Sequence, residues 1–250
     1  MASPAAADSA FGADLYRLLG DGTGGLVLSP ASIAAALRLA LLGARGHTAA
    51  ELATALHLSG PGEAAEGLRL LASVPAAGGD SQPGQDARDD QVIFRAPNTV
   101  WVQAGLPLQP EYTGAVAALA SGEVRDADFT GDPGQARHAI NELIEERTAG
   151  RIRDLLPPGG IGQLTRLVLA SAVYLKAAWE HPFPAGATAD APFHPEPGRD
   201  VTVAMMRLTA RLGYLRGEGY QAVLLPYRGR RLAMAVILPD GPPAPPGRAG

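Results

Sequence analysis

The chain has 250 residues, enough to bury a sizeable core, and its 46% hydrophobic and 18% charged residues are ordinary for a globular protein. A net charge of −4 without a basic run argues against nucleic acid and anionic membranes as partners, and no stretch approaches the roughly 20 apolar residues of a membrane span. The absence of cysteine excludes disulfides and thiolate chemistry but leaves the redox compartment open.

In chain order, the apolar spacing of the first ninety or so residues predicts helices separated by short breaks. Phe11, Leu15 and Leu18 recur at helical spacing, and Ser29 before Pro30 is a favourable N-cap and first helical position. The predicted elements are a disordered start over 1–7, helices over 8–19, 30–42 and 62–73, a helix capped by Thr48 and reaching Leu58, a strand over 26–28, and a mobile loop over 75–90.

Further along, the patterns shift towards strands. Residues 167–175 are almost unbroken by charge, too apolar for a strand with one wet face, and so predict a central strand covered on both sides. The other predictions are a strand over 99–103, helices over 109–120 and 133–147, an extended segment over 123–128, strands between 199 and 238, and a Pro-rich tail over 240–250. Helices first and strands later, without a regular repeat, predict an α+β fold.

Residues 141–183 hold the most specific pattern of the chain. An amphipathic helix ends at Thr148-Ala149-Gly150, where glycine can adopt the left-handed conformation that closes a helix. The run Pro157–Gly160 then excludes further helix. The local prediction is a helix lying across the buried strand 167–175.

This segment resembles the signature of the serpins, the serine protease inhibitor family. The matching positions are Asn141, Thr148, Gly150, Ile152, Thr165, Leu167, Val168, Leu169, Tyr174, Lys176, Trp179 and Phe183. Further blocks that resemble the family are 28–33, 43–48, 201–206, 224–229 and 238–241, so the resemblance runs in order from about residue 8 to residue 241.

The resemblance implies a serpin-like α+β fold, with N-terminal helices packed on a large mixed or antiparallel sheet and parts of two smaller sheets. Residues 1–250 would form a single incomplete domain, because a complete serpin continues further and nothing here matches its exposed reactive loop. In the family, a protease cleaves that loop and is carried along while the loop inserts into the large sheet as a new strand. Roughly ten inserted residues, at about 0.5 to 1.5 kcal/mol per hydrogen bond, would release on the order of 10 kcal/mol. Without the loop, this chain alone is predicted not to inhibit.

The resemblance also implies roles for residues near the place where the sheet parts. Ser29 and Ser32 match hydroxyls that form hydrogen bonds beneath the sheet, and Ser171 stands where the family usually has Asn. Trp179 matches the tryptophan at which insertion begins. Plain structural roles stay equally open: an N-cap for Ser29, small-residue packing for Ser171 and core packing for Trp179.

Three functional hypotheses follow. The first is a serpin that, at full length, inhibits a serine or cysteine protease. The second is a non-inhibitory remnant with a binding or structural role. The third is a Ser/His hydrolase, for which the sequence offers no assembled nucleophile.

Ligands other than a protease are not expected. The five histidines, at positions 47, 57, 138, 181 and 194, have no metal-binding spacing, and no cofactor is expected. Some serpins bind heparin-like polyanions through a basic helix, but the corresponding residues 62–73 hold only Arg69 against Glu63 and Glu66. The resemblance implies an extracellular protein, whereas no secretory signal is visible, so a cytoplasmic location stays open.

Overall fold

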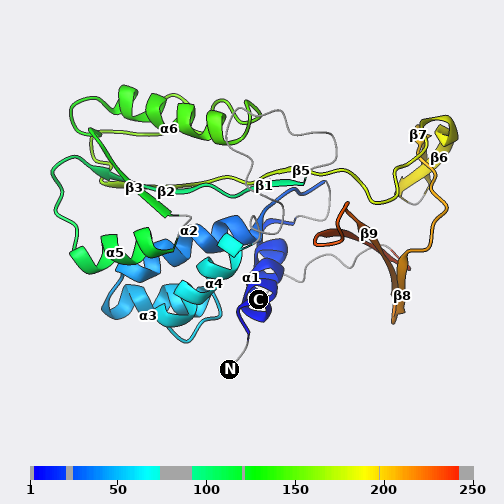
Figure 1. Cartoon of the computed structure of the whole chain (residues 1–250), viewed down its shortest axis with the longest axis horizontal. Helices are drawn as coiled ribbons and strands as arrows, with labels where there is room; N and C mark the ends of the chain where they lie inside the picture. The colour runs from blue at the N-terminus through cyan, green and yellow to red at the C-terminus, as the bar shows by residue number, and fades with distance from the viewer. Residues whose placement is uncertain (1–2, 21–24, 74–91, 120–121, 197, 242–250) are drawn as a thin grey trace. The chain divides into compact units, whose positions relative to one another are not determined.

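The computed structural model describes residues 3–20, 25–73, 92–119, 122–196 and 198–241 (Figure 1). The chain divides into two compact units: unit 1 lies within Met1–Gln85 and Ile93–Leu175, and unit 2 within Asp86–Val92 and Lys176–Gly250. The sequence predicts a single domain over residues 1–250. This stays a prediction, because a division into two compact units does not say whether the units unfold together or separately.

The elements are those of an α+β protein, as predicted. The helices are α1 (Pro4–Leu19), α2 (Pro30–Gly43), α3 (Gly46–Ala55), α4 (Pro61–Ser73), α5 (Pro110–Ala118), α6 (Pro133–Arg147) and the short 3-10 helix η2 (Ala185–Ala187). The strands are β1 (Ile93–Arg95), β2 (Asn98–Gln103), β3 (Gly122–Ala127), β4 (Leu167–Ser171), β5 (Tyr174–Lys176), β6 (Ala189–Glu196), β7 (Arg199–Met205), β8 (Gly213–Gly217), β9 (Tyr220–Pro226) and β10 (Ala233–Pro239). Helix α6 has the predicted bounds; β1 and β6 were not predicted.

Helices α1, α2 and α6 begin alike, with a proline in the first turn and a side-chain oxygen that caps a backbone N–H. At α1 the cap is Ser3, whose Oγ accepts a hydrogen bond from the N–H of Ala6 at 3.3 Å. The helix therefore starts at Pro4, and the predicted disorder is wrong for residues 4–7.

Helix α3 begins three residues earlier than predicted. Its N-cap is Arg45 and its first residue, Gly46, has φ +58°. Thr48 therefore lies inside the helix and is not its cap. The helix also ends before Leu58, because His57 adopts a left-handed φ of 54°.

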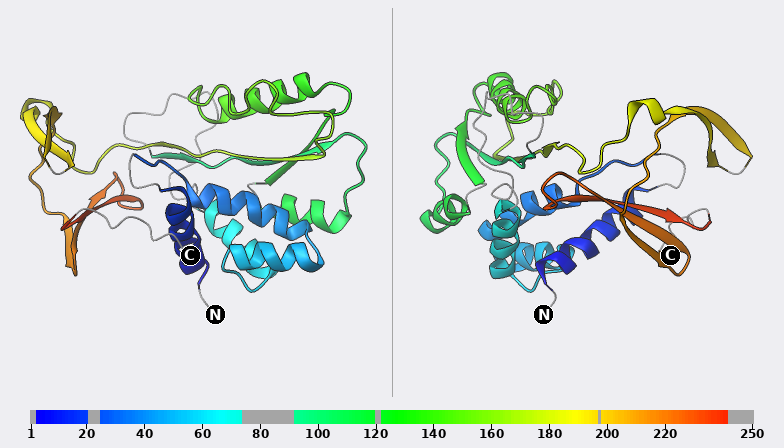
Figure 2. Two further views of the ribbon diagram at one scale, coloured as in Figure 1. Left: turned by 180° about the vertical axis from the view of Figure 1, so that it is seen from behind. Right: turned by 45° about the vertical axis from the view of Figure 1, so that its right-hand side comes forward.

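Unit 1 is built around a mixed three-stranded sheet of order β3-β2-β4, in which β2 is parallel to β3 and antiparallel to β4. Helix α6 covers one face, and α2 with α4 and α5 covers the other (Figures 1 and 2). The side chains of β2 alternate accordingly: Val100 and Val102 pack towards α2, and Trp101 packs towards α6.

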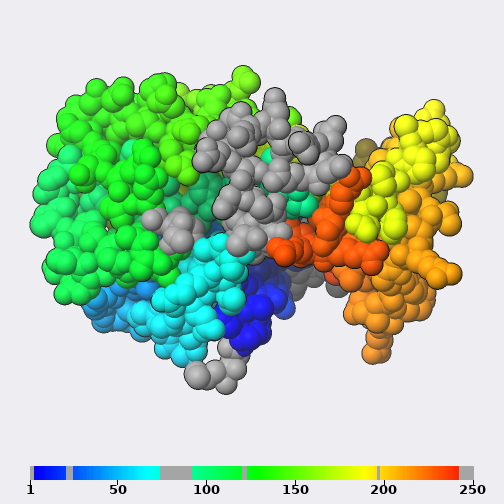
Figure 3. Space-filling model, in the orientation of Figure 1, coloured from blue at the N-terminus to red at the C-terminus, as the bar shows by residue number. Residues whose placement is uncertain are grey.

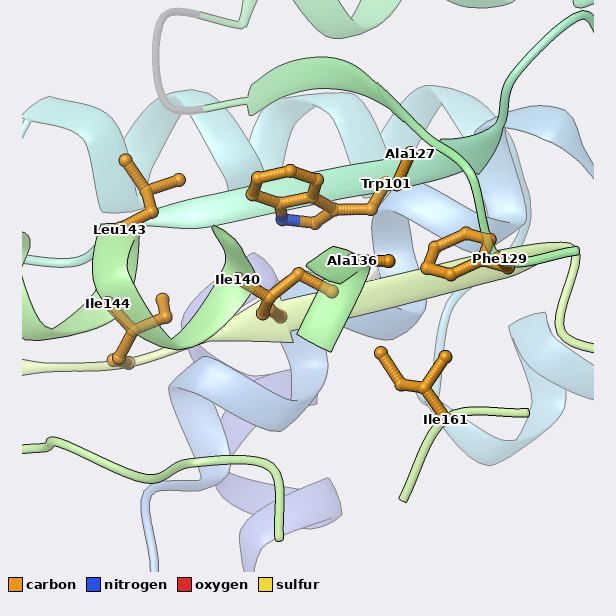
Figure 4. Close-up of a cluster of buried hydrophobic side chains, with 10 residues drawn as sticks. Trp101, Ala127, Phe129, Ala136, Ile140, Leu143, Ile144 and Ile161 are labelled. Atoms are coloured by element: carbon orange, nitrogen blue, oxygen red, sulfur yellow. The ribbon is translucent and has the colours of Figure 1, made fainter. Parts of the chain in front are cut away.

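The α6 face holds a buried cluster that joins the sheet, the helix and the loop that follows it (Figure 4). Its members are Trp101, Ala127, Phe129, Ala136, Ile140, Leu143, Ile144, Ile161, Ala170 and Ala172. Residues 141–183 predicted a helix lying across the strand 167–175. In the structure, α6 packs on β4 as predicted.

The predicted central strand over 167–175 differs in two ways from the observed one. It is broken into β4 and β5, because the opposing chain contains Pro97, whose nitrogen cannot donate to the ladder; only its carbonyl accepts, from the N–H of Ala172 at 3.1 Å. In addition, β2 is the central strand of the sheet, and β4 is an edge strand among the residues described. The prediction that 167–175 is the central strand is therefore wrong for these residues.

Unit 2 contains a β6–β7 hairpin with an irregular register near Phe193 and an antiparallel sheet of order β10-β9-β8. The predicted strand 26–28, by contrast, is wrong: these residues belong to no strand, and Val27 is 98% exposed. An apolar run forms a strand only where another strand pairs with it.

Two predicted segments fall largely outside the described residues. The predicted mobile loop 75–90 lies entirely there, and of the predicted tail 240–250 only residues 240 and 241 are described.

Candidate functional site

Ser29 and Ser32 form one hydroxyl pair, at the start of α2. Their Oγ atoms lie 2.8 Å apart, and the N–H of Ser32 also donates to the Oγ of Ser29 at 3.4 Å. Ser29 is therefore an N-cap, and its hydroxyl is shared with Ser32 rather than with a histidine. This arrangement does not match the nucleophile of a Ser/His hydrolase.

Ser171 forms a second polar pair, with a residue that the sequence did not single out. Its Oγ donates to the Oδ1 of Asn98 at 2.7 Å, and the Nδ2 of Asn98 donates to the carbonyl of Ala96 at 3.0 Å. Asn98 is only 2% exposed, so both ends of its amide are satisfied inside the protein. Asn98 follows Pro97 directly and begins the strand whose residues alternate. This position in the sequence could have indicated it as a candidate site residue.

Both polar pairs lie towards α2. Asn98 is opposite Ser171 in the ladder and shares the face of Val100, which packs against α2. Helix α2 packs on β2 and β4. The pair of Ser171 and Asn98 therefore lies on the sheet face that α2 covers, and the pair of Ser29 and Ser32 lies at the start of that helix.

Trp179 belongs to an aromatic cluster in unit 2. Its ring stacks on Tyr227, with centroids 4.6 Å apart and planes 10° apart, and meets Phe183 edge-on at 6.3 Å. Backbone bonds on either side fix the stack: the N–H of Glu180 donates to Pro226, and that of Arg228 donates to Ala178, both at 2.9 Å. The sequence analysis placed Tyr227 in the resembling block 224–229, but did not predict that it stacks on Trp179.

The signature residues at the end of α6 close the helix and hold the following loop. Asn141 is buried, and its amide bonds both backbone groups of Leu156, at 2.9 and 3.0 Å. The Oγ1 of Thr148, also buried, donates to the carbonyl of Ile144 at 2.7 Å and accepts from the N–H of Ile152 at 3.1 Å. Gly150 has φ +73°, the left-handed conformation predicted for it.

The remaining signature residues lie before and within the strands. Thr165 closes a turn by accepting from the N–H of Gly162 at 3.2 Å. The ring of Tyr174 in β5 lies under the guanidinium of Arg95 in β1, 5.8 Å from its carbon. Lys176 ends β5 and is exposed.

A partly buried ion pair between α1 and α2 was not foreseen from the sequence. Nη2 of Arg38 lies 2.6 Å from Oδ1 of Asp8, and the Arg38 side chain is 2% exposed. Its Nε has no hydrogen-bond partner, while Gly67 of α4 makes room for the guanidinium. An isolated Arg in an apolar helix gives no sequence signal of the carboxylate that will neutralise it.

The described residues contain no cluster of three or more His, Asp or Glu side chains placed to hold a metal ion. Within the same residues, no helix combines the length and apolarity that crossing a membrane requires.

Comparisons with known proteins agree with this architecture. Residues 6–244 match the family Serpin (serine protease inhibitor). An uncharacterized serpin-like protein of Thermococcus kodakarensis is 40% identical over 233 residues, which are 92% of this chain and 52% of that protein. The leukocyte elastase inhibitor of Bos taurus is 33% identical over 240 residues, 94% of this chain and 60% of that protein.

Among solved structures, a cleaved serpin ("Cleaved Serpin 42Da") superposes with a TM-score of 0.81 at 30% identity, covering 94% of this chain and 61% of that one. The chain thus spans between half and two thirds of the length of these relatives. The match to the family over nearly the whole chain shows that it belongs to the serpins, a family of protease inhibitors and not of enzymes.

Proposed function

We propose that this chain forms part of the scaffold of a serine protease inhibitor that acts by strand insertion beside β4. We also propose that residues 1–250 alone do not trap a protease. The observation that carries the proposal is that β4 is an edge strand of the β3-β2-β4 sheet among the residues that the structure describes. Helices cover both faces of this sheet, so the edge has room for one further strand and not for a second layer.

The relatives support an inhibitory role for the whole protein. One of them is named leukocyte elastase inhibitor, which makes a serine protease the partner to test first, and a cysteine protease the second. Nothing in residues 1–250 matches a reactive loop, and the chain spans only 60% of that relative. Inhibition is therefore proposed for a longer polypeptide that supplies the loop.

Within this proposal, the two polar pairs control how the sheet opens at β4. Ser29 and Ser32 bond to each other at the start of α2, and Ser171 ties the end of β4 to β2 through Asn98. Because Asn98 provides the amide, Ser171 is tolerated where the family usually has Asn. Trp179, stacked on Tyr227, has its proposed role at the place where insertion begins.

The test compares the chain with an extended version of it. Residues 1–250 are incubated with elastase, and a chimera continues from Leu238 with the remaining part of the bovine relative. We expect no covalent complex on a denaturing gel with the first and a complex with the second. Elastase whose active-site serine is replaced by alanine is the control, because it cannot form the acyl bond.

Two outcomes would count against the proposal. A covalent complex with residues 1–250 would show that no further segment is needed. A chimera that is cleaved without forming a complex, although its thermal unfolding shows that it is folded, would favour the alternative of a non-inhibitory serpin scaffold with a binding or structural role.

A further inference from the structure

Helix α1 contains a glycine that its backbone does not require. Gly12 lies inside the helix and is not among the glycines with positive φ, and glycine is one of the least favourable residues in a helix interior. Its packing gives the reason: a Cβ at this position would lie 3.2 Å from both Cβ and Cγ of Pro30, the first residue of α2. Gly12 therefore lets α1 approach the start of α2 closely.

A second contact holds α1 on the same helix. Oδ1 of Asp8, one turn before Gly12, lies 2.6 Å from Nη2 of Arg38, whose buried charge would be left uncompensated if the two helices separated. Apolar side chains of both helices also share one buried cluster: Ala7, Phe11, Ala34 and Leu41. Helix α1, dark blue in Figure 3, lies beside α4, in cyan, as well. These contacts keep α1 from moving away from α2.

Helix α2 separates α1 from the sheet. The residues that meet α1 or share its buried cluster recur at helical spacing along one face of α2: Pro30, Ala34, Arg38 and Leu41. Ala35 and Leu39 lie on another face and pack against β2. Ser32 shares this second face, because it precedes Ala35 by three residues and Leu39 by seven, and it is buried. A shift of the start of α2 therefore moves Ser32 relative to the sheet.

We infer that α1 positions the hydroxyl pair of Ser29 and Ser32. It does so through its two contacts with α2, made by Gly12 and Asp8. A side chain at position 12 would press the first turn of α2 towards the sheet, because the ion pair and the apolar cluster hold α1 in place. All these residues belong to unit 1. What the pair then controls, the opening of the sheet beside β4, rests on the proposed function.

The first experiment disturbs the contact at Gly12. Gly12→Ala adds one methyl group against α2; Gly114→Ala is its matched control, because a Cβ at Gly114, inside α5, would meet no atom of the described residues within 4 Å. Hydrogen exchange followed by NMR reports on the N–H groups of Ser32 and Ile33, which both donate to Ser29. We expect both to exchange about tenfold faster in Gly12→Ala, a coupling of the size found between residues in contact, and at the parent rate in Gly114→Ala.

The second experiment loosens the other contact without adding bulk, and so keeps the inference testable if Gly12→Ala does not fold. Asp8→Asn preserves the shape of the side chain but removes the charge that neutralises Arg38. Asp14→Asn is its control, since Asp14 lies on the same helix but pairs with exposed partners, Arg17 and His57. We expect Asp8→Asn, and not Asp14→Asn, to speed the same exchange.

The third experiment asks whether the position of the hydroxyl pair matters for strand insertion. The chimera described above is incubated with elastase, with and without Gly12→Ala. We expect the share of chimera that is cleaved without forming a covalent complex to rise about twofold or more, because the displaced helix opposes the opening of the sheet. The chimera carrying Gly114→Ala should behave as its parent.

Three results would overturn the inference. The first is unchanged exchange at Ser32 and Ile33 in a folded chain of either variant, Gly12→Ala or Asp8→Asn. The second is an equal change in a control variant, and the third is an unchanged share of complex in the Gly12→Ala chimera. A parent chimera that forms no complex would instead count against the proposed function, and the exchange measurements would then decide the inference by themselves.

Discussion

Both units of this serpin chain contain β-sheets, but they bury their apolar residues to very different extents. In unit 1, helices lie on both faces of the β3-β2-β4 sheet, and side chains such as Ile140 and Val100 are fully buried. In unit 2, the β8–β10 sheet leaves side chains such as Ile237 and Leu238 exposed. Strands alone do not make a core; the covering layer decides how much each residue contributes to stability.

The largest expected difference is between two isoleucines. Ile140→Ala should lower the free energy of unfolding of unit 1 by about 2 to 5 kcal/mol, because it leaves a cavity beside Trp101. Ile237→Ala should change that of unit 2 by no more than about 0.5 kcal/mol. Each unit contains one tryptophan, Trp101 or Trp179, so urea unfolding can be followed separately by fluorescence after replacing the other with Phe. Similar losses of unfolding free energy in both units would contradict the expected effect of burial.

A second comparison concerns side-chain hydrogen bonds. Asn141→Ala should cost about 1 to 3 kcal/mol, since it removes two bonds and leaves the N–H of Leu156 without its partner, while the C=O of Leu156 keeps its bond from Arg137. Tyr214→Phe removes an exposed bond of 3.3 Å to Gln221 in unit 2 and should cost no more than about 0.5 kcal/mol. Urea unfolding measures both, and a stable Asn141→Ala chain would show that water replaces the lost partner.

The packing density of unit 1 can be tested with two glycines of one helix, α4. A Cβ at Gly67 would lie 2.6 Å from Cζ of Arg38, whereas a Cβ at Gly62 would meet nothing within 4 Å. Gly67→Ala should therefore destabilise unit 1 by about 1 to 3 kcal/mol. Gly62→Ala should leave stability unchanged or raise it by up to about 1 kcal/mol, because Ala favours helix. Thermal unfolding should show a lower unfolding temperature for Gly67→Ala and an equal or higher one for Gly62→Ala. Equal shifts of the unfolding temperature would mean that Arg38 moves away freely.

The smallest expected effect is electrostatic and lies on the surface of unit 1. The hydrogen bond from His57, at 2.7 Å, is the main cause that holds the pKa of Asp14 below its ordinary 3.8. Because this folded-state pKa is lowered, the stabilisation is present above the unfolded pKa and is lost as the pH falls through the folded one. An NMR titration should show the pKa of Asp14 rising in His57→Ala. Arg17→Ala, which removes a weaker contribution, should raise it less; the opposite order would contradict the assignment to His57.

Much of unit 1 could be predicted because its signals are local. Helix α6 has Asp132 as cap, Pro133 in its first turn and Gly150 beyond its end, and its predicted bounds are the observed ones. The alternation that predicted a strand over 99–103 likewise matches β2, whose two faces meet two different helices. The serpin resemblance, carried by residues of the same region, is confirmed.

Other predictions failed where the outcome depends on a distant partner. Leu26–Leu28 has strand composition but no strand beside it, and residues 167–175 are interrupted because Pro97 lies opposite. Ser171 was recognised from the resemblance, but its partner Asn98 is 73 positions away in the chain. Neither spacing nor composition encodes such a separation.

The amino-acid order by itself determined the helices, the bounds of α6 and the family, because caps, prolines, left-handed glycines and apolar periodicity act within a few residues. Tertiary structure alone decided that β2 is the central strand among those described in its sheet, and that Asn98 supplies the amide for Ser171. These outcomes depend on which strands and helices become neighbours, and pairing and burial are properties of neighbours in space.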